Sequence, residues 1–229
     1  MQSNFSLLFD LDGTLVNTDE LHFGAYQVLL GELGRSITIE TYQSRIMGAP
    51  NDAIMREFFP DVPESRHQAL ADRKEALFRA SVTRLEPTAG ALRVFEWAQA
   101  RGVGIAVVTN APRANAELLL SGLKLTDRID ALVIGEELPR GKPDPLPYLT
   151  GLERLGGNAE RALAFEDSLS GIRAASAADI YTFGMRTGLP TQTLLDAGAN
   201  DVIDDFTAAS LWHILDDVAT GALSAERRA

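Results

Sequence analysis

The chain has 229 residues, enough for one large domain or for a core with a smaller inserted module. Its formal net charge of -11 disfavours nucleic acid as a partner, because the phosphate backbone would be repelled by such a surface. The absence of cysteine excludes disulfides, a thiol nucleophile and thiolate zinc sites, so a bound metal would need oxygen ligands, which favours Mg²⁺ over Zn²⁺.

The N-terminal segment MQSNFSLLFDLDG has no basic stretch followed by a long apolar run, so no signal peptide is predicted. Apolar runs such as VGIAVVT are long enough for a strand and too short to span a bilayer. We therefore expect a cytoplasmic protein without a membrane partner; the oligomeric state is left open.

Short apolar runs that alternate with helical patterns indicate the architecture of most of the chain. Strands are predicted at residues 5–9, 103–109, 131–134, 161–165 and 180–183, with a weaker one at 201–203. Helices are predicted at residues 89–101, 112–123, 145–155, 170–178 and 207–218. This alternation predicts an α/β fold with a doubly wound, Rossmann-like parallel sheet and helices on both faces.

One segment after the first strand lacks the alternation and contains only helical patterns. Helices are predicted there at residues 20–33, 39–47, 52–59 and 64–85. We therefore predict an all-helical unit over residues 17–85, inserted into a core formed by residues 1–16 and 86–229.

The first motif that carries chemistry is FDLDGTL at residues 9–15. It places Asp10 and Asp12 two residues apart at the end of an apolar strand, where ligands bind in open α/β sheets. Two crowded carboxylates repel each other unless a cation joins them. A simple Asp-Gly turn is the alternative, but the whole string after a strand is far more specific than a turn signal.

Two further motifs follow later strands. Thr109 and Asn110 end the second strand, where a hydroxyl, an amide and free N–H groups suit phosphate oxygens, although a helix N-cap explains them as well. Lys142 lies in the stiff segment GKPDP, which positions its ammonium by the backbone. The alternative is a solvated loop lysine, the usual fate of this residue type.

Glu166 and Asp167 form the fourth motif, FEDS, after the strand predicted at residues 161–165. A parallel sheet brings the ends of its strands to one edge, so the four motifs are expected to form a single site. Carboxylates for a hard cation, a lysine for negative charge and donors for oxygen are the groups that phosphoryl transfer needs.

The order DxDGT, T-N, a lysine in GKPDP and E-D-S resembles the four signature motifs of the haloacid dehalogenase superfamily. The helical insertion is similar to the C1 cap of its phosphoglycolate phosphatase and β-phosphoglucomutase branch. The resemblance implies that Asp10 attacks phosphorus and forms an aspartyl-phosphate, and that Asp12 acts as general acid and then as general base.

The same resemblance implies the remaining roles in the core. Mg²⁺ would be held by the Asp10 carboxylate, the Asp12 carbonyl and the Asp167 carboxylate, with Glu166 acting through water. Lys142 would contact Asp10 and the phosphoryl group. The equatorial phosphoryl oxygens would be bound by Thr109 and Asn110.

Three further residues lie outside the four motifs. His22, on the first predicted cap helix, either positions Asp12 or the substrate, as the family implies, or lies on the helix surface near a hinge. Arg113 lies close to Thr109 in the sequence and is predicted to contact the substrate. Lys74, the lysine of the helical unit, is expected on a solvated face, so a phosphonatase with a Schiff-base lysine is not favoured.

The function that this resemblance implies is Mg²⁺-dependent hydrolysis of a small phosphorylated metabolite. Dehalogenation is rejected because Asp12, Glu166 and Asp167 are all present. A β-phosphoglucomutase-like phosphomutase is the nearest alternative, but Asn51 stands where that family has an arginine three residues after a cap glycine, here Gly48. Arg45 or Arg56 could replace that arginine from neighbouring turns. A non-catalytic phosphate-binding module is a more remote alternative.

Overall fold

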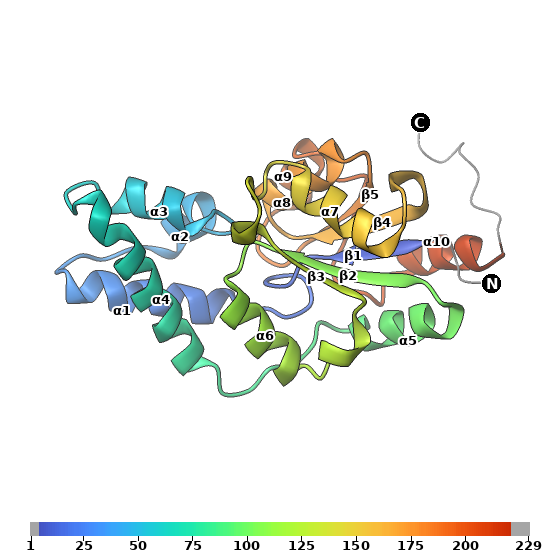
Figure 1. Cartoon of the computed structure of the whole chain (residues 1–229), viewed down its shortest axis with the longest axis horizontal. Coiled ribbons are helices and arrows are strands. Elements are labelled where there is room, and N and C mark those ends of the chain that lie inside the picture. The colour runs from blue at the N-terminus through green and yellow to red at the C-terminus, as the bar shows by residue number, and fades with distance from the viewer. Residues whose placement is uncertain (1–4, 221–229) are drawn as a thin grey trace.

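The structure is a computed structural model that describes residues 5–220, so the predicted ends of the core at 1–4 and 221–229 lie outside the described residues. Within the described part, six strands form one parallel sheet in the order β3-β2-β1-β4-β5-β6 (Figure 1). They are β1 (Ser6–Phe9), β2 (Gly104–Thr109), β3 (Ala131–Ile134), β4 (Ala162–Glu166), β5 (Tyr181–Met185) and β6 (Asp201–Ile203). All six predicted strands are confirmed, and their ends shift by at most two residues.

Helices cover both faces of the sheet, as a doubly wound fold requires (Figure 1). Successive residues of β1 point to opposite faces: Leu7 packs in one apolar cluster and Leu8 in another. The Leu7 face is covered by α5 (Ala91–Arg101), α6 (Arg113–Gly122) and α10 (Ala209–Thr220), and the Leu8 face by α7 (Leu146–Leu155) and α8 (Leu169–Ala177). The predicted α/β class is therefore confirmed.

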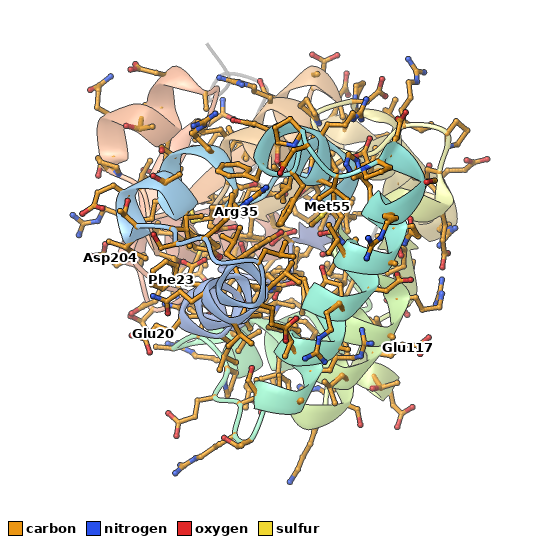
Figure 2. All side chains as sticks on the ribbon, turned by 90° about the vertical axis from the view of Figure 1, so that its left-hand side faces the viewer. Glu20, Phe23, Arg35, Met55, Glu117 and Asp204 are labelled. Carbon is orange, nitrogen blue, oxygen red and sulfur yellow. The ribbon has the colours of Figure 1, made fainter. Side chains whose placement is uncertain are left out.

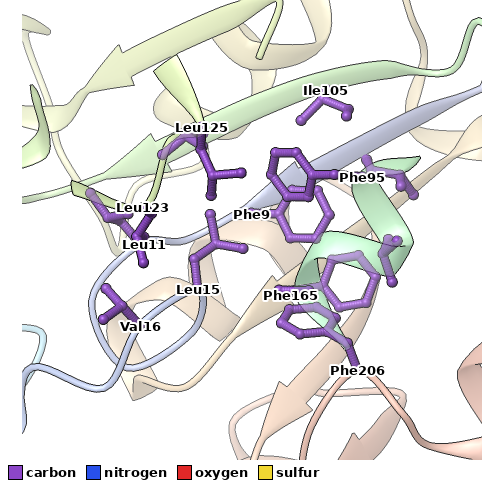
Figure 3. Close-up of a cluster of buried hydrophobic side chains, with 14 of the residues drawn as sticks. Phe9, Leu11, Leu15, Val16, Phe95, Ile105, Leu123, Leu125, Phe165 and Phe206 are labelled. Carbon is purple, nitrogen blue, oxygen red and sulfur yellow. The ribbon is translucent and has the colours of Figure 1, made fainter. Parts of the chain in front are cut away.

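A stack of aromatic rings fixes the middle of the sheet beside the strand ends (Figure 3). Phe9 and Phe165 are register partners on β1 and β4, and their rings stack 4.8 Å apart. Such a pair contributes roughly 0.5–1.5 kcal/mol beyond its buried area. Because Asp10 and Glu166 come directly after these two rings, the stack sets the two acidic residues side by side.

Residues 19–81 form four helices that build an apolar cluster of their own around Tyr26, Leu29, Met55 and Phe59. They are α1 (Asp19–Glu32), α2 (Ile39–Arg45), α3 (Asn51–Phe58) and α4 (His67–Ser81), with a 3₁₀ turn at Glu64–Arg66. They lie together at one end of the molecule, and Figure 2 shows this end with α1 viewed nearly along its axis. We call this group of helices the cap.

Two differences from the predicted elements have simple causes. The helix predicted at residues 64–85 ends at Ser81, because Val82 is extended and the chain then returns to the core. The short helix α9 (Thr191–Asp196) was not predicted, since only Leu194 of its residues is buried. Within residues 5–220, no helix is both long enough and apolar enough to cross a bilayer.

The chain crosses between core and cap twice, and the two crossings are joined to each other. The N–H of Thr88 donates to the carbonyl of Leu15 at 2.9 Å, and the Thr88 hydroxyl donates to the carbonyl of Thr14 at 2.6 Å. The outgoing and returning segments therefore run as a hydrogen-bonded pair at the base of the cap.

Candidate active site

The loop after β1 holds Asp10 and Asp12 at the carboxyl end of the sheet. The N–H of Asp10 donates to the Phe165 carbonyl at 2.9 Å, which continues the pairing of β1 with β4 by one residue. Gly13 then turns the chain with a φ of +80°. A Cβ at Gly13 would lie 2.1 Å from Oδ2 of Asp167, so the two acidic loops can approach this closely only with glycine there.

Lys142 joins the ends of three strands through its ammonium group. Its Nζ donates to Oδ1 of Asp10 at 2.6 Å, to Oε1 of Glu166 at 2.5 Å and to the Val108 carbonyl at 2.7 Å. Burial alone would lower the pKa of Lys142, but Asp10 and Glu166 raise it above its ordinary value. Lys142 is therefore a fixed cation beside Asp10, with all three of its protons engaged.

Glu166 is completely buried and is held by donors on both oxygens. Its Oε1 accepts from Lys142 and from the Tyr148 hydroxyl at 2.7 Å, and its Oε2 accepts from the Ser168 hydroxyl at 3.2 Å. These contacts place Glu166 as the anchor of Lys142 and leave Asp10 and Asp167 as the more available carboxylates.

The three carboxylates lie close enough together to share one cation. Asp10, Glu166 and Asp167 each offer an oxygen, and these oxygens all lie within 4.8 Å of one another. Burial raises the pKa of Asp10 and of Asp167 well above its ordinary value, and the neighbouring carboxylates raise both further. A hard divalent cation would offset this repulsion, and the all-oxygen donor set is the one that Mg²⁺ prefers.

Asp12 faces the cap and is contacted by Thr18, which precedes α1, and by His22 of α1. The Thr18 hydroxyl donates to Oδ1 of Asp12 at 2.5 Å, and Nε2 of His22 lies 3.2 Å from the same oxygen. Thr18 precedes α1 but makes no capping bond, because its hydroxyl is used here. Burial alone would raise the pKa of Asp12, but the bonds from His22 and Thr18 lower it overall.

The expectation that Lys74 lies on a solvated face is wrong. Lys74 is 4% exposed, and its Nζ lies 2.9 Å from Nδ1 of His22 and 3.0 Å from Oε1 of Glu75. An ammonium has only protons to offer, so Nδ1 of His22 accepts, and Nε2 carries the proton that is donated to Asp12. Asp12, His22 and Lys74 thus form one directional chain of hydrogen bonds from the core into the cap.

Glu75 continues this chain and links the cap back to the core. Asn51 donates to its Oε1 at 2.9 Å, and Asn115 of α6 donates to its Oε2 at 2.6 Å. Arg79 of α4 in turn donates to the Asn115 carbonyl oxygen at 2.8 Å. The side chain of Asn115 is fully buried, so this core residue holds two side chains of α4 at once.

Thr109 and Asn110 lie at the pocket but also support the loops around it. The Thr109 hydroxyl accepts from the N–H of Ala111 at 3.0 Å. The Asn110 amide accepts from the Lys142 N–H at 3.2 Å and donates to the Lys142 carbonyl at 3.3 Å. Asn110 therefore fixes the backbone that carries the central lysine.

Arg113 is not brought to the pocket, as far as residues 5–220 form its walls. Its guanidinium is about half exposed and pairs with Glu137 at 2.6 Å and with Glu117 at 3.2 Å. These partners raise the pKa of Arg113, but they hold its charge on the surface of α6.

The remaining predicted residues, except the fully buried Glu166, line one cavity between the sheet edge and the cap. Its walls include Asp10, Asp12, His22, Thr109, Asn110, Lys142 and Asp167. The cavity has a volume of about 100 Å³, which is room for a few waters. A phosphoryl group with a small organic group attached is of this size.

Several cap residues of the cavity were not predicted from the sequence. Asp19 and Tyr26 lie three residues before and four residues after His22, so all three share one face of α1. Tyr42 of α2 also lines the cavity, and its hydroxyl donates to Asp19 at 3.2 Å. Helical spacing from His22 could have identified the first two, whereas nothing in the sequence marks Tyr42.

Comparison with known proteins gives consistent matches over almost the whole chain. It is 33% identical to a phosphorylated carbohydrates phosphatase of Thermotoga maritima over 205 residues, which cover 85% of this chain and 91% of that protein. It is 31% identical to a phosphoglycolate phosphatase of Rhodospirillum rubrum, with 90% of each chain covered. A crystal structure of β-phosphoglucomutase from Clostridium difficile superposes with a TM-score of 0.82 at 20% identity, covering 98% of this chain and 100% of that one.

The family match covers the segment that contains all four sequence motifs. The family described as haloacid dehalogenase-like hydrolase matches residues 7–185, from β1 to the end of β5. This range includes the cap, the loop of Asp10, Lys142 and the loop of Asp167. The chain belongs to the haloacid dehalogenase-like hydrolase family.

Proposed function

We propose that this haloacid dehalogenase-like phosphatase hydrolyses a small phosphate monoester through Mg²⁺ and a phosphorylated Asp10. The observation that carries the proposal is the opposite anchoring of the two aspartates. Asp10 is held by Lys142 of the core at 2.6 Å, whereas Asp12 is held by Thr18 at 2.5 Å and faces His22 of the cap. One carboxylate is thereby set for attack and the other for proton transfer.

The carboxylates of Asp10 and Asp167 and the backbone carbonyl of Asp12 would hold the Mg²⁺, with Glu166 contributing through water. The cation would supply charge that offsets the repulsion between an anionic nucleophile and an anionic phosphoryl group. The oxygen donors and the raised pKa values of Asp10 and Asp167 support this assignment.

In the first step, a carboxylate oxygen of Asp10 forms a bond to phosphorus as the bond to the leaving oxygen breaks. Lys142 favours the ionised form of Asp10 and orients its carboxylate during the attack. Thr109 and Asn110 would donate to the equatorial oxygens of the phosphoryl group. Water then attacks the phosphorylated Asp10, which releases inorganic phosphate and restores the carboxylate.

Asp12 would carry the proton in both steps. It gives its proton to the leaving oxygen, and afterwards it removes a proton from the attacking water. Without substrate, the lowered pKa of Asp12 keeps it ionised. A phosphate dianion at Asp10 would raise that pKa, because a nearby negative charge disfavours a second one. Binding of substrate is therefore expected to favour protonation of Asp12, which can then act as the general acid.

The cap over residues 17–85 would act as a second unit that closes on the core of 1–16 and 86–229. The joined crossings at Leu15 and Thr88 give it a common hinge. Closure brings His22 to Asp12 and excludes water from the site.

Water is favoured over a second sugar phosphate as the acceptor. Asn51, where a mutase would carry arginine, donates to Glu75. Arg45 and Arg56 are both more than half exposed and pair with Glu57 and Asp52 of the cap. A bisphosphate intermediate would thus lack a guanidinium at the cap end of the pocket, where the one cation, Lys74, is paired with Glu75, and this supports a phosphatase.

Lys74 does not support a phosphonatase, although it lies in the pocket. Its ammonium is engaged with His22 and Glu75 and lies 4.8 Å from the centre of the Tyr26 ring. Burial lowers the pKa of Lys74, but the carboxylates of Glu75 and Asp12 favour its charged form, and a charged amine has no lone pair with which to form a Schiff base.

The proposal is tested with p-nitrophenyl phosphate and a panel of phosphorylated metabolites. We expect phosphate release that requires Mg²⁺ and stops with chelator. Acid quenching in the steady state should trap phosphate on the peptide that contains Asp10. Folded protein that releases no phosphate from any compound at any pH would instead favour a phosphate-binding module.

A further inference from the structure

The cap wall of the pocket contains a buried carboxylate that the proposed reaction does not use. Glu75 is 5% exposed and accepts from Lys74 at 3.0 Å, from Asn51 at 2.9 Å and from Asn115 at 2.6 Å. All four side chains are fixed by one another, and three of them, Glu75, Lys74 and Asn51, line the pocket. The carboxylate is thus part of the preformed surface that a leaving group would meet.

The charge of Lys74 is compensated within this wall. Its ammonium lies against the Glu75 carboxylate and His22, so its field does not reach into the pocket as a free positive charge. Asp19 adds a second carboxylate to the lining. Apart from the ammonium of Lys142, which is engaged with Asp10 at the other end, the described lining has no further lysine or arginine.

Tyr26 contributes a hydroxyl that lacks a partner. The residue is 2% exposed and lines the pocket, and within residues 5–220 its hydroxyl makes no hydrogen bond. Burial and the Glu75 carboxylate raise the pKa of Tyr26, so the group stays a neutral hydroxyl. A buried hydroxyl without a partner is unfavourable, and a ligand hydroxyl that bonded to it would relieve this.

We propose that the cap wall selects an uncharged leaving group rich in hydroxyls, such as a polyol or sugar, and rejects one that carries a carboxylate or a second phosphate. Glu75 is the residue that repels the anionic groups, and Tyr26 is the hydrogen-bond partner of a substrate hydroxyl. This inference rests on the proposed phosphatase activity and names the substrate class of the same site.

The selection follows from charge and from hydrogen-bonding capacity. The cap side of the lining carries two carboxylates, Glu75 and Asp19, against the single ammonium of Lys74, so an added anion meets net negative charge that water screens poorly. A hydroxyl can donate to the carboxylates of Glu75 or Asp19 and can either donate to or accept from Tyr26. The same carboxylates therefore bind an uncharged leaving group through its hydroxyls and repel a leaving group that carries a carboxylate or a second phosphate.

The test uses pairs of monoesters that differ only in the charge far from the reacting phosphate. Glycerol 3-phosphate is compared with 3-phosphoglycerate, and fructose 1-phosphate with fructose 1,6-bisphosphate. In the wild type, kcat/KM should be at least about tenfold higher for the uncharged member of each pair. A preference for the anionic members would overturn the inference.

The Glu75→Gln variant keeps the size of the side chain and removes its charge. We expect it to reduce the preference within each pair by about tenfold, chiefly through faster turnover of the anionic member. Glu64→Gln, the same change at an exposed position of the cap, should leave the ratios unchanged. Unaltered ratios in folded Glu75→Gln protein would contradict the assignment.

Tyr26→Phe provides a second measurement that does not depend on Glu75. Removing a hydroxyl without a partner should leave Tm unchanged or slightly higher, while kcat/KM for fructose 1-phosphate falls about fivefold. Turnover of p-nitrophenyl phosphate, which has no hydroxyl for this group, should fall by less than turnover of fructose 1-phosphate. Tyr181→Phe on β5, a tyrosine that does not line the pocket, is the control. Equal loss with both substrates would show a structural effect and remove Tyr26 from this role.

These measurements separate the two proposals. If neither p-nitrophenyl phosphate nor any of the four monoesters is hydrolysed in the presence of Mg²⁺, the proposed phosphatase activity is contradicted. If p-nitrophenyl phosphate is hydrolysed but the pairs show no preference, only the inference about the cap wall fails.

Discussion

The ammonium of Lys142 lies 2.6 Å from Oδ1 of Asp10 and 2.5 Å from Oε1 of Glu166, so one buried cation balances two carboxylates. Asp10 follows β1, Glu166 ends β4 and Lys142 lies in the segment after β3, so the three residues come from distant parts of the chain. Lys142 therefore makes the charge of Asp10 compatible with burial, and it does so before any substrate arrives.

Replacing Asp10 with asparagine should abolish turnover while the fold is kept. The change removes the nucleophile at nearly constant shape, and loss of a nucleophile costs roughly 10³-fold or more in rate. The measurement is p-nitrophenyl phosphate hydrolysis by protein whose asparagine is verified by mass spectrometry. Asp72→Asn on the exposed side of α4 is the matched control. Activity within about tenfold of wild type would remove Asp10 from the role.

Asp167→Asn should stabilise the metal-free protein while it weakens catalysis. Burial and the charges of Asp10 and Glu166 raise the pKa of Asp167, so its ionised form is unfavourable without a cation. We expect Tm in chelator to rise by roughly 2–4 °C, the shift that about 1 kcal/mol produces at this size. The increase in Tm on adding Mg²⁺ should shrink. A lower Tm in chelator would contradict this account of the site.

Asn115→Ala should weaken closure of the cap. The variant leaves Oε2 of Glu75 and the guanidinium of Arg79 without their core partner, at a cost of roughly 1–3 kcal/mol. We expect a higher KM, and greater cap mobility in small-angle scattering. Asn158→Ala, which removes an N-cap in the core, is the control for a general loss of stability. A cap that packs identically in free and phosphate-bound crystals would count against the hinge.

The nearest rival activity is tested directly with β-glucose 1-phosphate and a trace of the 1,6-bisphosphate. Asn51 donates to Glu75 and, unlike an arginine, cannot bind a distal phosphate with a charged bidentate guanidinium. Inorganic phosphate should therefore be the main product. Both products are followed in one reaction. Glucose 6-phosphate formed much faster than phosphate would make the protein a mutase.

Stability at low pH should depend on Glu75. Burial alone would raise the pKa of Glu75, but Lys74, His22 and Asn51 lower it below the ordinary value of 4.5. Its stabilisation is therefore complete above about pH 4.5 and is lost as the pH falls through the lowered value. The difference in unfolding free energy between wild type and Glu75→Gln should shrink from pH 6.5 to 3.5 in urea titrations. A constant difference would show that the carboxylate is not stabilised by its partners.

The sequence located the core of the site because its signals are local. Asp10, Asp12, Glu166 and Asp167 directly follow apolar strands, and parallel strands bring such positions to one edge. Lys74 and Glu75 gave no such signal. They lie on a helix with polar residues on several faces, and periodicity cannot distinguish a polar face that meets solvent from one that closes a pocket. Only the packing of α4 against α1 and α6 decides this.

Gly48 of the cap touches the loop that follows Asp167. Its carbonyl accepts from the Ser170 hydroxyl at 2.7 Å, and a Cβ on Gly48 would lie 2.5 Å from that of Ser168. The segment that presents Asp167 thus also forms the surface of the core that Gly48 of the cap contacts. A larger residue at Gly48 would have to displace this loop or stay clear of it, so substrate preference can be altered at Glu75 or Tyr26 far more freely than at the point where cap and core meet.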